Sequence, residues 1–563
     1  MVIGKTFFSL FPVPSPLLPS PQLFQRLYSL TRNNKVDECQ DQKTELLEDI
    51  KNTMPEIHQS IAQHYHERTK YDPETLASKS QQLDWAKQPV PFKEYKIGSD
   101  FDLKPYLQEK PESFVHNPDG KWWQRLSQLL FHSYGLTAKM PSLGSAVYLR
   151  SAPSAGGLYP SEVYLVSRGT PLLPAGLYNY QCRTHSLMQF WENDVWTALQ
   201  AACLWHPSLE STQLAIITTA VFYRSAWRYE DRAYRRIFLD TGHLLGNIEL
   251  ASAITDYRPH LIGGFVDEAV NDLLYIDPEQ EGATVVMALA DLLDVKQNLP
   301  LGKTALPSAT DTNYPSIPDG ELLKYFHFHT QIKSDETGKK NLTVTKPETT
   351  LEDKYNFPFC DKISTVTTPI DWGKNLADLE NTIYKRRSTR AYSGDDLTFD
   401  ELKALLDFTY QSQNYLDQNL DTAPDYFDLN LIETFIAVSG VKGLDSGCYY
   451  YAPKAQELRQ IRFKNFRREL HFLCLGQELG RDAGAVIFHT ADLKTAIEQY
   501  GDRVYRYLHL DAGHLGQRLN LAAIRLNLGV SGIGGFFDDQ VNDVLGIPAD
   551  EAVLYITTLG RPR

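Results

Sequence analysis

The segment YKRRSTRAY, residues 384–392, places three arginines and a serine within five positions. Guanidinium groups bind phosphate through paired hydrogen bonds, and a serine hydroxyl adds a further donor. The pattern therefore predicts a site for a phosphate monoester. On composition alone, the alternative is a solvated basic surface at the start of a helix. The candidate residues are Arg386, Arg387, Ser388 and Arg390.

A second unusual segment, residues 149–160, reads LRSAPSAGGLYP. Its adjacent glycines allow a positive φ or a close approach of a ligand to the backbone. Its serine can donate a hydrogen bond, and its small side chains would let a flat ring lie against the main chain. The alternative is an ordinary turn before the strand that EVYLV predicts. The candidate contacts are Pro153, Ser154, Ala155, Gly156 and Gly157.

The sequence IGGF occurs twice, at 262–265 and 533–536. A Gly-Gly turn presents backbone N–H groups to a ligand at low steric cost. Because the turn is duplicated, a purely architectural role is the alternative. In the second occurrence, the candidate contacts are Ile533, Gly534 and Gly535.

Aspartate and histidine stand three positions apart in LDTGH, residues 239–243, and in LDAGH, residues 510–514. They could form an acid/base pair, but the apolar periodicity around them favours a histidine that packs between helices. No G-x-S-x-G or Walker A motif appears. The glycines at 529–536 precede no helix of the kind that a dinucleotide-binding motif requires.

The strongest signal of organisation is an internal repeat. Residues 231–276 and 502–547 align without a gap at a constant offset of 271, and 21 of 46 positions are identical. A duplicated domain often recreates a twofold dimer within one chain, with two equivalent clefts at its interface. The arginine segment belongs only to the second copy and the Pro-Ser-Ala-Gly-Gly loop only to the first. At the spacing equivalent to the arginine segment, residues 110–119 contain no arginine.

Short β-branched or aromatic runs predict strands, and two long segments with helical periodicity predict helices. The strands are expected at 161–167, 214–222, 433–440 and 484–491, and the helices at 233–254 and 504–526. These segments do not alternate as strict βαβ units. They predict the α+β fold class, with two tandem domains that form an intramolecular pseudo-dimer.

The repeat and a linker rich in proline, serine and threonine divide the chain into four parts. These are an N-terminal extension at 1–53, a first repeat domain at 54–296, the linker at 297–320 and a second repeat domain at 321–563. Prolines in the extension disfavour the helical core of a signal peptide. A disordered tail, or translation from a start upstream of Met54, is the favoured interpretation, and an organellar transit peptide is the alternative.

The composition excludes several function classes. With 56 basic and 70 acidic residues the net charge is −14, which argues against nucleic acid as a partner. No apolar run reaches the roughly 18 residues of a membrane span, so no membrane segment is expected. The six cysteines show no spacing typical of a zinc site or a disulfide framework. We therefore expect no metal, reduced thiols and a cytoplasmic location.

Taken together, these motifs resemble the FMN-dependent nitroreductase family, and within it the SagB/ThcOx-type dehydrogenase branch in a tandem-domain form. The resemblance covers roughly residues 60–563. RRSTR is similar to the family's FMN phosphate motif, PSAGGLYP to a Pro-Ser loop that reaches the flavin from the opposite subunit, and GIGGF to the stretch that faces flavin N5. The closing LGRPR resembles the family's C-terminal basic element, which adds Arg561 and Arg563 as phosphate candidates.

The resemblance implies one complete flavin site. In the family's dimer, a site takes its phosphate motif from one subunit and its Pro-Ser loop from the other. Here the two parts lie in different repeats, so they complement each other across the internal interface, whereas the second cleft would lack both. We therefore expect one FMN per chain, with NAD(P)H as one electron donor that the family allows.

One departure from the branch concerns its Lys-Tyr pair, which is thought to act as a base. The first repeat has Arg228 and Tyr229 at this place, and the second has Gln499 and Tyr500. Glutamine cannot serve as a base and arginine stays protonated, so azoline oxidation by that mechanism is not expected. Tyr500 and Tyr229 are the candidates for exchanging a proton with the substrate.

The expected function is that of an FMN-dependent oxidoreductase acting on a small organic or peptide-derived substrate by hydride transfer through flavin N5. The alternatives are an NAD(P)H-dependent nitro- or quinone reductase and a non-catalytic flavin-binding protein. The expected partners are limited to the substrate, and assembly beyond the pseudo-dimer is left open.

Overall fold

The structure is a computed structural model. It describes residues 59–78, 83–108, 117–141, 146–293, 304–334 and 352–563. Within the described part of the chain, residues from Gln59 onward belong to one compact unit. The predicted N-terminal extension lies outside the described residues, as does the first part of the linker.

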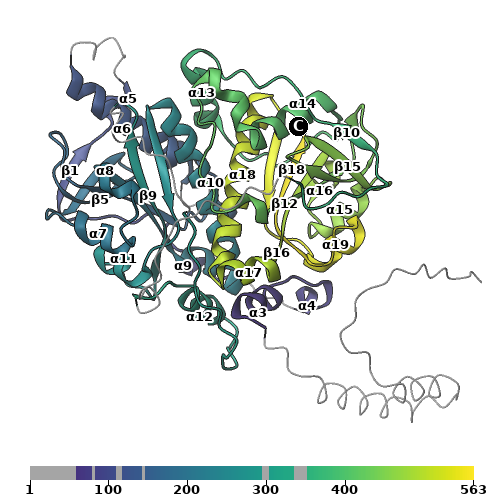
Figure 1. Cartoon of the computed structure of the whole chain (residues 1–563), viewed down its shortest axis with the longest axis horizontal. Helices are drawn as coiled ribbons and strands as arrows, with labels where there is room; N and C mark the ends of the chain where they lie inside the picture. The colour runs from purple at the N-terminus through teal and green to yellow at the C-terminus, as the bar shows by residue number, and fades with distance from the viewer. Residues whose placement is uncertain (1–58, 79–82, 109–116, 142–145, 294–303, 335–351) are drawn as a thin grey trace, which may run out of the picture. The chain divides into compact units, whose positions relative to one another are not determined.

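Each repeat folds around a seven-stranded antiparallel sheet (Figure 1). The first sheet has the order β1-β6-β5-β4-β7-β9-β8 and the second has the order β10-β15-β14-β12-β16-β18-β17, so the two repeats share one topology. The buried strands are rich in β-branched and aromatic residues, which favour extended backbone. The expected strands are found, and the α+β prediction is confirmed.

The strands of the first sheet are β1 (Ser99–Asp102), β4 (Ser161–Ser167), β5 (Gly176–Gln181), β6 (Ser186–Trp191), β7 (Leu214–Val221), β8 (Tyr257–Ile262) and β9 (Glu281–Asp291). Those of the second are β10 (Lys362–Ser364), β12 (Glu433–Val438), β14 (Gly447–Ala452), β15 (Glu457–Arg462), β16 (Ala485–Asp492), β17 (Gly529–Ile533) and β18 (Glu551–Gly560). Two small ladders pair β2 (Leu136–Met140) with β3 (Val147–Arg150) and β11 (Leu397–Thr398) with β13 (Val441–Lys442).

Helices cover the faces of both sheets. The longest are α10 (Ala233–Ile254) and α18 (Val504–Arg525). The other α-helices are α3 (Ile61–Arg68), α4 (Pro73–Ser78), α5 (Pro105–Gln108), α6 (Pro118–Tyr134), α7 (Trp196–Ala202), α8 (Ser208–Ser211), α9 (Phe222–Tyr229), α11 (Asp267–Leu273), α12 (Leu322–His329), α13 (Ala377–Lys385), α14 (Phe399–Tyr410), α15 (Arg467–Leu473), α16 (Glu478–Asp482), α17 (Leu493–Tyr500) and α19 (Asp538–Leu545). Short 3₁₀ turns are η1 (Trp85–Lys87), η3 (Ala155–Gly157), η4 (Glu230–Arg232), η7 (Lys374–Leu376), η8 (Ser412–Gln418) and η9 (Leu429–Leu431).

The first helix of each repeat packs against the other repeat. Beside α3, the backbone N–H of Tyr71 donates to the Asp538 carboxylate at the start of α19. Beside α12, Ile332 donates to the Asp267 carboxylate at the start of α11. Since these helices are exchanged between the repeats, the sequence boundaries of the two domains do not coincide with the two packed halves.

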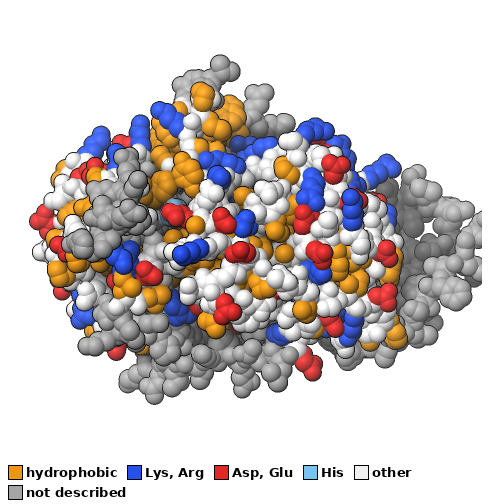
Figure 2. All heavy atoms as spheres, turned by 90° about the horizontal axis from the view of Figure 1, so that it is seen from above, with side chains coloured by type: hydrophobic (Ala, Val, Ile, Leu, Met, Phe, Trp, Pro, Cys, Tyr) orange, Lys and Arg blue, Asp and Glu red, His pale blue; other side chains and the backbone are white. Residues whose placement is uncertain are grey.

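The surface mixes charges of both signs. In Figure 2, basic and acidic side chains are interspersed over the visible face, with hydrophobic groups between them. The net acidic charge is thus not gathered in one patch on this face. No helix among the described residues is long and apolar enough to cross a membrane.

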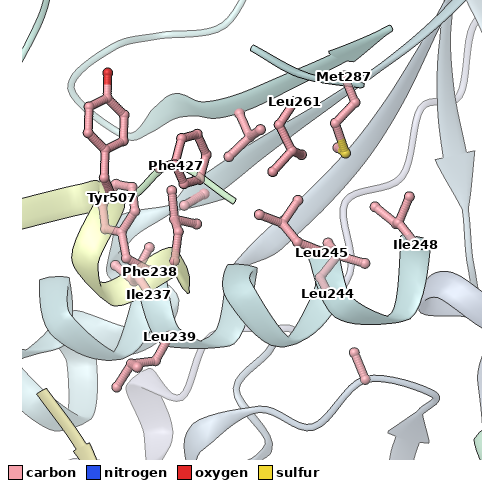
Figure 3. Close-up of a cluster of buried hydrophobic side chains, with 14 of the residues drawn as sticks. Ile237, Phe238, Leu239, Leu244, Leu245, Ile248, Leu261, Met287, Phe427 and Tyr507 are labelled. Carbon is pink, nitrogen blue, oxygen red and sulfur yellow. The ribbon is translucent and has the colours of Figure 1, made fainter. Parts of the chain in front are cut away.

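The two repeats share a core along the central helices. Both α10 and α18 are buried along most of their length, and they pack against each other. Figure 3 shows the apolar residues of α10, among them Ile237 and Leu245, next to Phe427 and Tyr507 of the second repeat. This shared core makes the pair of repeats one folding unit and fixes any site that lies between them.

Candidate functional site

A cavity with a volume of about 130 Å³ lies between the repeats. It brings together three segments that the sequence singled out: the Pro-Ser loop of the first repeat, the arginine segment of the second, and the second Gly-Gly turn. We call it the composite cavity. Its lining residues are Pro153, Ser154, Ala155, Gly156, Arg236, Leu239, Asp240, His243, Ser388, Arg390, Ser531, Gly532, Gly534 and Tyr555.

The Pro-Ser loop reaches the cavity through the turn η3. Gly156 and Gly157 have φ angles of 64° and 67°, which disfavour any residue with a Cβ. A Cβ at Gly156 would also lie 2.8 Å from the Tyr229 hydroxyl. Glycine is therefore required at this position by both conformation and space.

Asp240 on α10 holds this loop in place. Its carboxylate accepts hydrogen bonds from the Ser154 hydroxyl at 2.5 Å and from the Ala155 N–H at 3.0 Å. Burial raises the pKa of Asp240 to about 7, although these hydrogen bonds favour the charged form. The aspartate of LDTGH thus anchors the loop rather than pairing with the histidine three residues on.

His243, one turn along α10, lines the same cavity. Its Nε2 lies 2.8 Å from the Tyr555 hydroxyl and its Nδ1 lies 2.9 Å from Oε1 of Gln517. Burial lowers the pKa of His243 to about 4, so the ring is neutral at physiological pH. This neutral histidine joins the two repeats through hydrogen bonds.

Some residues of the arginine segment line the cavity, and others bind neighbouring parts of the protein. Ser388 and Arg390 line the cavity. Arg386 is buried, and it donates from Nε to the Ser151 carbonyl and from Nη2 to the Arg150 carbonyl at 3.1 Å, while its Nη1 has no partner among the described residues. Burial lowers the pKa of Arg386 to about 10. Arg386 therefore ties the arginine segment to the backbone that leads into the Pro-Ser loop.

Three predicted phosphate ligands lie outside the cavity. Arg387 donates to the hydroxyl and the carbonyl of Thr137, both at 3.0 Å. Arg561 donates to both oxygens of the Glu401 carboxylate, at 2.9 and 2.8 Å. The exposed Arg563 pairs its backbone N–H with Ala391. These arginines stabilise their own surroundings in this structure.

The second Gly-Gly turn contributes Gly534 to the cavity wall. A Cβ there would lie 2.5 Å from Nη1 of Arg236. Gly535 faces Leu475 and Tyr71, and Ile533 is buried at the end of β17. Neither Gly534 nor Gly535 donates its backbone N–H to another described residue.

The two candidate tyrosines occupy different environments. Tyr229 does not line the composite cavity, but it lies beside two residues that do. The Arg236 guanidinium is 3.8 Å from its ring centre, a Cβ on Gly156 would lie 2.8 Å from its hydroxyl, and burial raises its pKa. Tyr500 donates to Asp428 at 2.8 Å, in the cleft that the 271-residue offset relates to the composite cavity. Of the two tyrosines, Tyr229 is therefore the one next to the composite cavity.

The cleft related to the composite cavity by the 271-residue offset is filled. The loop at 424–428 occupies the position equivalent to the Pro-Ser loop, and its aromatic side chains point inward. Phe427 stacks on Tyr507 with ring centres 4.9 Å apart, and Tyr426 stacks on His514 at 4.3 Å. The constant offset could have identified this loop from the sequence, where it was taken to be missing.

The linker closes the same cleft. The Thr304 carbonyl accepts hydrogen bonds from the N–H groups of Gly263 and Gly264, both at 3.0 Å. Leu306 packs so closely on Gly264 that a Cβ there would lie 2.2 Å from it, and the Tyr507 hydroxyl donates to the Leu306 carbonyl at 2.9 Å. The backbone groups that are free in the second repeat are therefore satisfied by the chain itself in the first.

Seven cavity residues were not among the predicted contacts, although LDTGH had been considered as an acid/base pair. They are Arg236, Asp240, His243, Leu239, Ser531, Gly532 and Tyr555. The first three follow one face of α10 at steps of four and three residues, which a helical projection shows. Among the described residues, no group of three or more His, Cys, Asp or Glu side chains could hold a metal ion.

Comparison with known proteins shows which family the chain resembles. The model of the nitroreductase family matches residues 128–290 and 383–561, one segment in each repeat. A putative nitroreductase of Methanocaldococcus jannaschii is 31% identical over 183 residues, covering 32% of this chain and 90% of that protein. The trifolitoxin-processing protein TfxF of Rhizobium leguminosarum is 26% identical over 132 residues, covering 23% of this chain and 43% of TfxF.

A solved structure covers both repeats at once. The crystal structure of a putative nitroreductase from Anabaena variabilis is 80% identical, with a TM-score of 0.85, and it covers 90% of this chain and all of that one. Both the tandem arrangement and the fold are thus shared with an experimentally solved protein. The chain belongs to the nitroreductase family, with two family segments in tandem.

Proposed function

We propose that the chain is an FMN-dependent oxidoreductase that binds one FMN at the composite cavity. The cavity of about 130 Å³ is smaller than the roughly 300–1,000 Å³ typical of ligand sites, so FMN would widen it on binding or extend beyond it. The observation that carries this proposal is the convergence of three separate segments on one cavity, while the equivalent cleft is filled by Phe427 and Leu306. Family membership supports the oxidoreductase class, and FMN is the cofactor that the resemblance implied.

The residues at one end of the cavity fit a phosphate monoester. Ser388 offers a hydroxyl and Arg390 an exposed guanidinium. Arg386 keeps Nη1 buried without a partner, and a buried donor left unsatisfied is costly. A dianionic phosphate in the cavity would meet Ser388 and Arg390 directly, whereas Arg386 does not line the cavity and would reach the phosphate only after its side chain moves.

The other end fits a flat ring. Gly156 and Gly534 present bare backbone there, because a Cβ would collide with Tyr229 at the first position and with Arg236 at the second, and Ser154 is fixed by Asp240. The N–H groups of Gly534 and Gly535 are available to an acceptor. FMN bound here would supply two-electron hydride chemistry, and the protein would position the substrate beside it.

Tyr229 is the residue that we propose exchanges a proton with the substrate. It lies against Gly156 and Arg236 at this ring end. Burial raises its pKa, so its hydroxyl stays protonated at neutral pH and can donate. Tyr500 has no such role in this proposal because its hydroxyl is bound to Asp428 inside the filled cleft.

The substrate class that we propose is a small organic or peptide-derived molecule. The similarity to TfxF, a protein named for processing trifolitoxin, supports an assignment to the SagB/ThcOx-type dehydrogenase branch. An NAD(P)H-dependent nitro- or quinone reductase is the second candidate, supported by the similarity to a putative nitroreductase.

The test begins with the cofactor. The purified protein should release FMN on denaturation, and titration of the flavin-free protein should end at one FMN per chain. FAD, or an end point of two, would contradict the proposal. Steady-state NAD(P)H consumption with a quinone acceptor then separates the two candidate functions, because only the reductase sustains it.

A further inference from the structure

Two arginines at the start of α10 form ion pairs with the same aspartate. Arg232 and Arg235 are both buried, and both donate to the carboxylate of Asp538, at 2.8 and 2.7 Å. One aspartate thus compensates two guanidiniums that lie three residues apart on one face of the helix.

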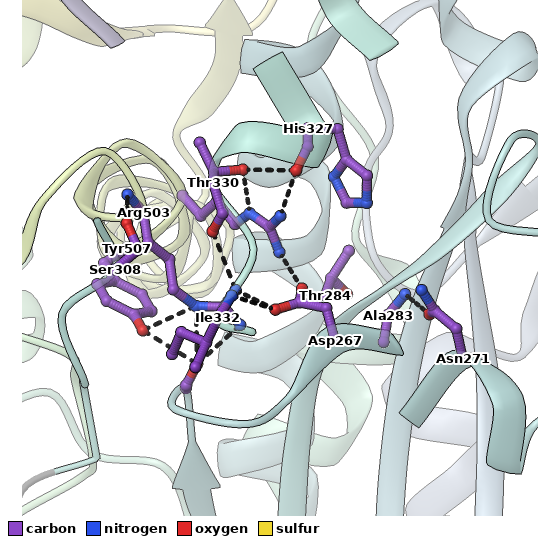
Figure 4. A network of polar contacts seen from close by, with 12 residues as sticks. Asp267, Asn271, Ala283, Thr284, Ser308, His327, Thr330, Ile332, Arg503 and Tyr507 are labelled. Atoms are coloured by element: carbon purple, nitrogen blue, oxygen red, sulfur yellow. Dashed lines mark hydrogen bonds and ion pairs between the residues drawn. The ribbon is translucent and has the colours of Figure 1, made fainter. Parts of the chain in front are cut away.

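The same arrangement recurs in α18. Arg503 and Arg506 donate to Asp267 at 2.6 and 2.7 Å, as Figure 4 shows for Arg503. The third arginine of α10, Arg236, breaks the symmetry: its counterpart at the offset of 271 is Tyr507, whose hydroxyl donates to backbone carbonyls. At this position the first repeat therefore carries a buried guanidinium that the second repeat lacks.

Arg236 has no carboxylate partner among the described residues. It is only 7% exposed, it lines the composite cavity, and its Nε has no hydrogen-bond partner. Its Nη2 lies 3.5 Å from the Tyr71 hydroxyl, and its plane lies 3.8 Å above the Tyr229 ring. A buried cation without a counter-charge is costly, so an anion brought by a ligand would stabilise it.

The nearest acid fills this role only in part: the charge of Arg236 acts to lower the pKa of Asp240 without a direct ion pair. Asp240 lies one turn along α10, and its oxygens accept from Ser154 and Ala155. No ion pair joins it to Arg236 among the described residues. The cavity therefore offers Arg236 and Arg390 against a single, already bonded carboxylate.

Arg236 reaches the cavity from α10, whereas Ser388 and Arg390 reach it from the arginine segment. Thr389 in the arginine segment pairs with Val530 at 2.9 Å, whereas Arg236 contacts Gly534, four residues further along the chain. With Ser388 and Arg390 assigned to the phosphate in the proposed function, Arg236 is left for a second anionic group.

We propose that Arg236 binds an anionic group of the substrate, a carboxylate, and thereby selects for acidic substrates. The inference rests on the proposed function, because it takes the ligand at this end of the cavity to be the substrate. The planar guanidinium stacked on Tyr229 presents a fork of donors that matches the two oxygens of a carboxylate.

Benzoate and benzamide test the proposal, since they share a shape and differ in charge. Binding to the protein, with its flavin content measured separately, would be followed by calorimetry. We expect benzoate to bind about 10-fold or more tightly than benzamide, because a hydrogen bond to a charged group is at stake. In Arg236→Gln the ratio should fall to within about 3-fold, and Arg236→Lys should retain part of it. The matched control is Arg228→Gln, which removes an exposed arginine beside Tyr229 and should leave the ratio nearly unchanged.

Equal affinities in the wild type would overturn the proposal. So would an Arg236→Gln variant that loses flavin while keeping the benzoate preference, because Arg236 would then serve the cofactor. If the protein holds no FMN yet prefers benzoate through Arg236, the proposed function fails and the anion site stands.

Discussion

Gly242 and Gly513 face each other where α10 packs against α18. A Cβ on Gly242 would lie 2.2 Å from the Leu510 carbonyl oxygen, and one on Gly513 would lie 2.3 Å from the Leu239 carbonyl oxygen. The two helices thus meet backbone to backbone. This contact brings the cavity residues of α10 within reach of those of the second repeat.

Gly242→Ala tests how far the site depends on this contact. Alanine is favoured over glycine in an isolated helix by about 1 kcal/mol. Here we expect alanine to destabilise the protein, because the new methyl group would meet backbone atoms that cannot move without separating the helices. The free energy of unfolding and the FMN affinity should both fall. Ser252→Ala, at a buried position on the same helix, is the control, and an unchanged melting temperature in Gly242→Ala would contradict the prediction.

Neighbouring arginines of the arginine segment should differ in their effect on FMN affinity. Arg390 lines the cavity, whereas Arg387 is bonded to Thr137. Loss of one hydrogen bond to a charged group costs about 1.5–3 kcal/mol, or about 10- to 150-fold in affinity. We expect such a loss for Arg390→Gln and less than about 3-fold for Arg387→Gln. Fluorescence titration of flavin-free protein measures both, and a reversed order would place the phosphate elsewhere.

The fold could be predicted further than the site. The repeat, the two long helices and the strands follow from periodicity, which depends on residues near one another in sequence. The pairing of the Pro-Ser loop with the arginine segment also followed, because each part occurred only once. The ion pair of Arg561 could not be predicted, because its motif says nothing about Glu401, a partner 160 residues away; its role as a phosphate ligand stays a prediction.

Arg236 could not be recognised for a related reason. In the sequence it is one of three arginines close together, and only tertiary structure shows that Asp538 compensates Arg232 and Arg235 but not Arg236. The filling of the second cleft depends likewise on the linker, whose Thr304 carbonyl finds the two glycine N–H groups only in the folded chain.

Ionisation of Asp240 should make the free energy of unfolding depend on pH. Its pKa is raised to about 7 in the folded state, against about 3.9 in an unfolded chain. Between these values the folded state holds more protons, so the contribution of Asp240 to stability falls as pH rises from about 4 to about 7 and is constant above. The full change is on the order of 4 kcal/mol.

The measurement is a difference between wild type and Asp240→Asn. Buried histidines such as His243, with a pKa lowered to about 4, produce the opposite trend over the same range, and subtraction removes them. The stability of Asp240→Asn relative to wild type should rise from pH 4 to pH 7. A difference that does not vary with pH would show that Asp240 is ionised throughout.

Phe427 should matter for stability but not for flavin stoichiometry. It is 2% exposed and stacks on Tyr507 in the filled cleft. Phe427→Ala should cost about 3–5 kcal/mol of unfolding free energy because it leaves a cavity. The cleft would still lack a phosphate site, so the end point should stay at one FMN per chain. Phe427→Leu, which keeps most of the volume, should cost much less, and a second bound FMN in Phe427→Ala would refute the interpretation.

The two candidate tyrosines should separate in kinetic experiments. Tyr229 lies against Arg236, which lines the composite cavity, whereas the Tyr500 hydroxyl is bound to Asp428. We expect Tyr229→Phe to lower the rate of substrate turnover per bound flavin by about 10²-fold or more, the range typical of general acid–base groups. Tyr500→Phe should lower stability by about 1 kcal/mol through the lost hydrogen bond and change turnover per flavin by less than about 2-fold. Flavin content must be measured for each variant, because Tyr229 also contacts the glycine loop. Equal losses of turnover per flavin in both variants would mean that the second cleft takes part in the reaction. Unchanged turnover in Tyr229→Phe would assign the proton to another donor, such as water at the mouth of the cavity.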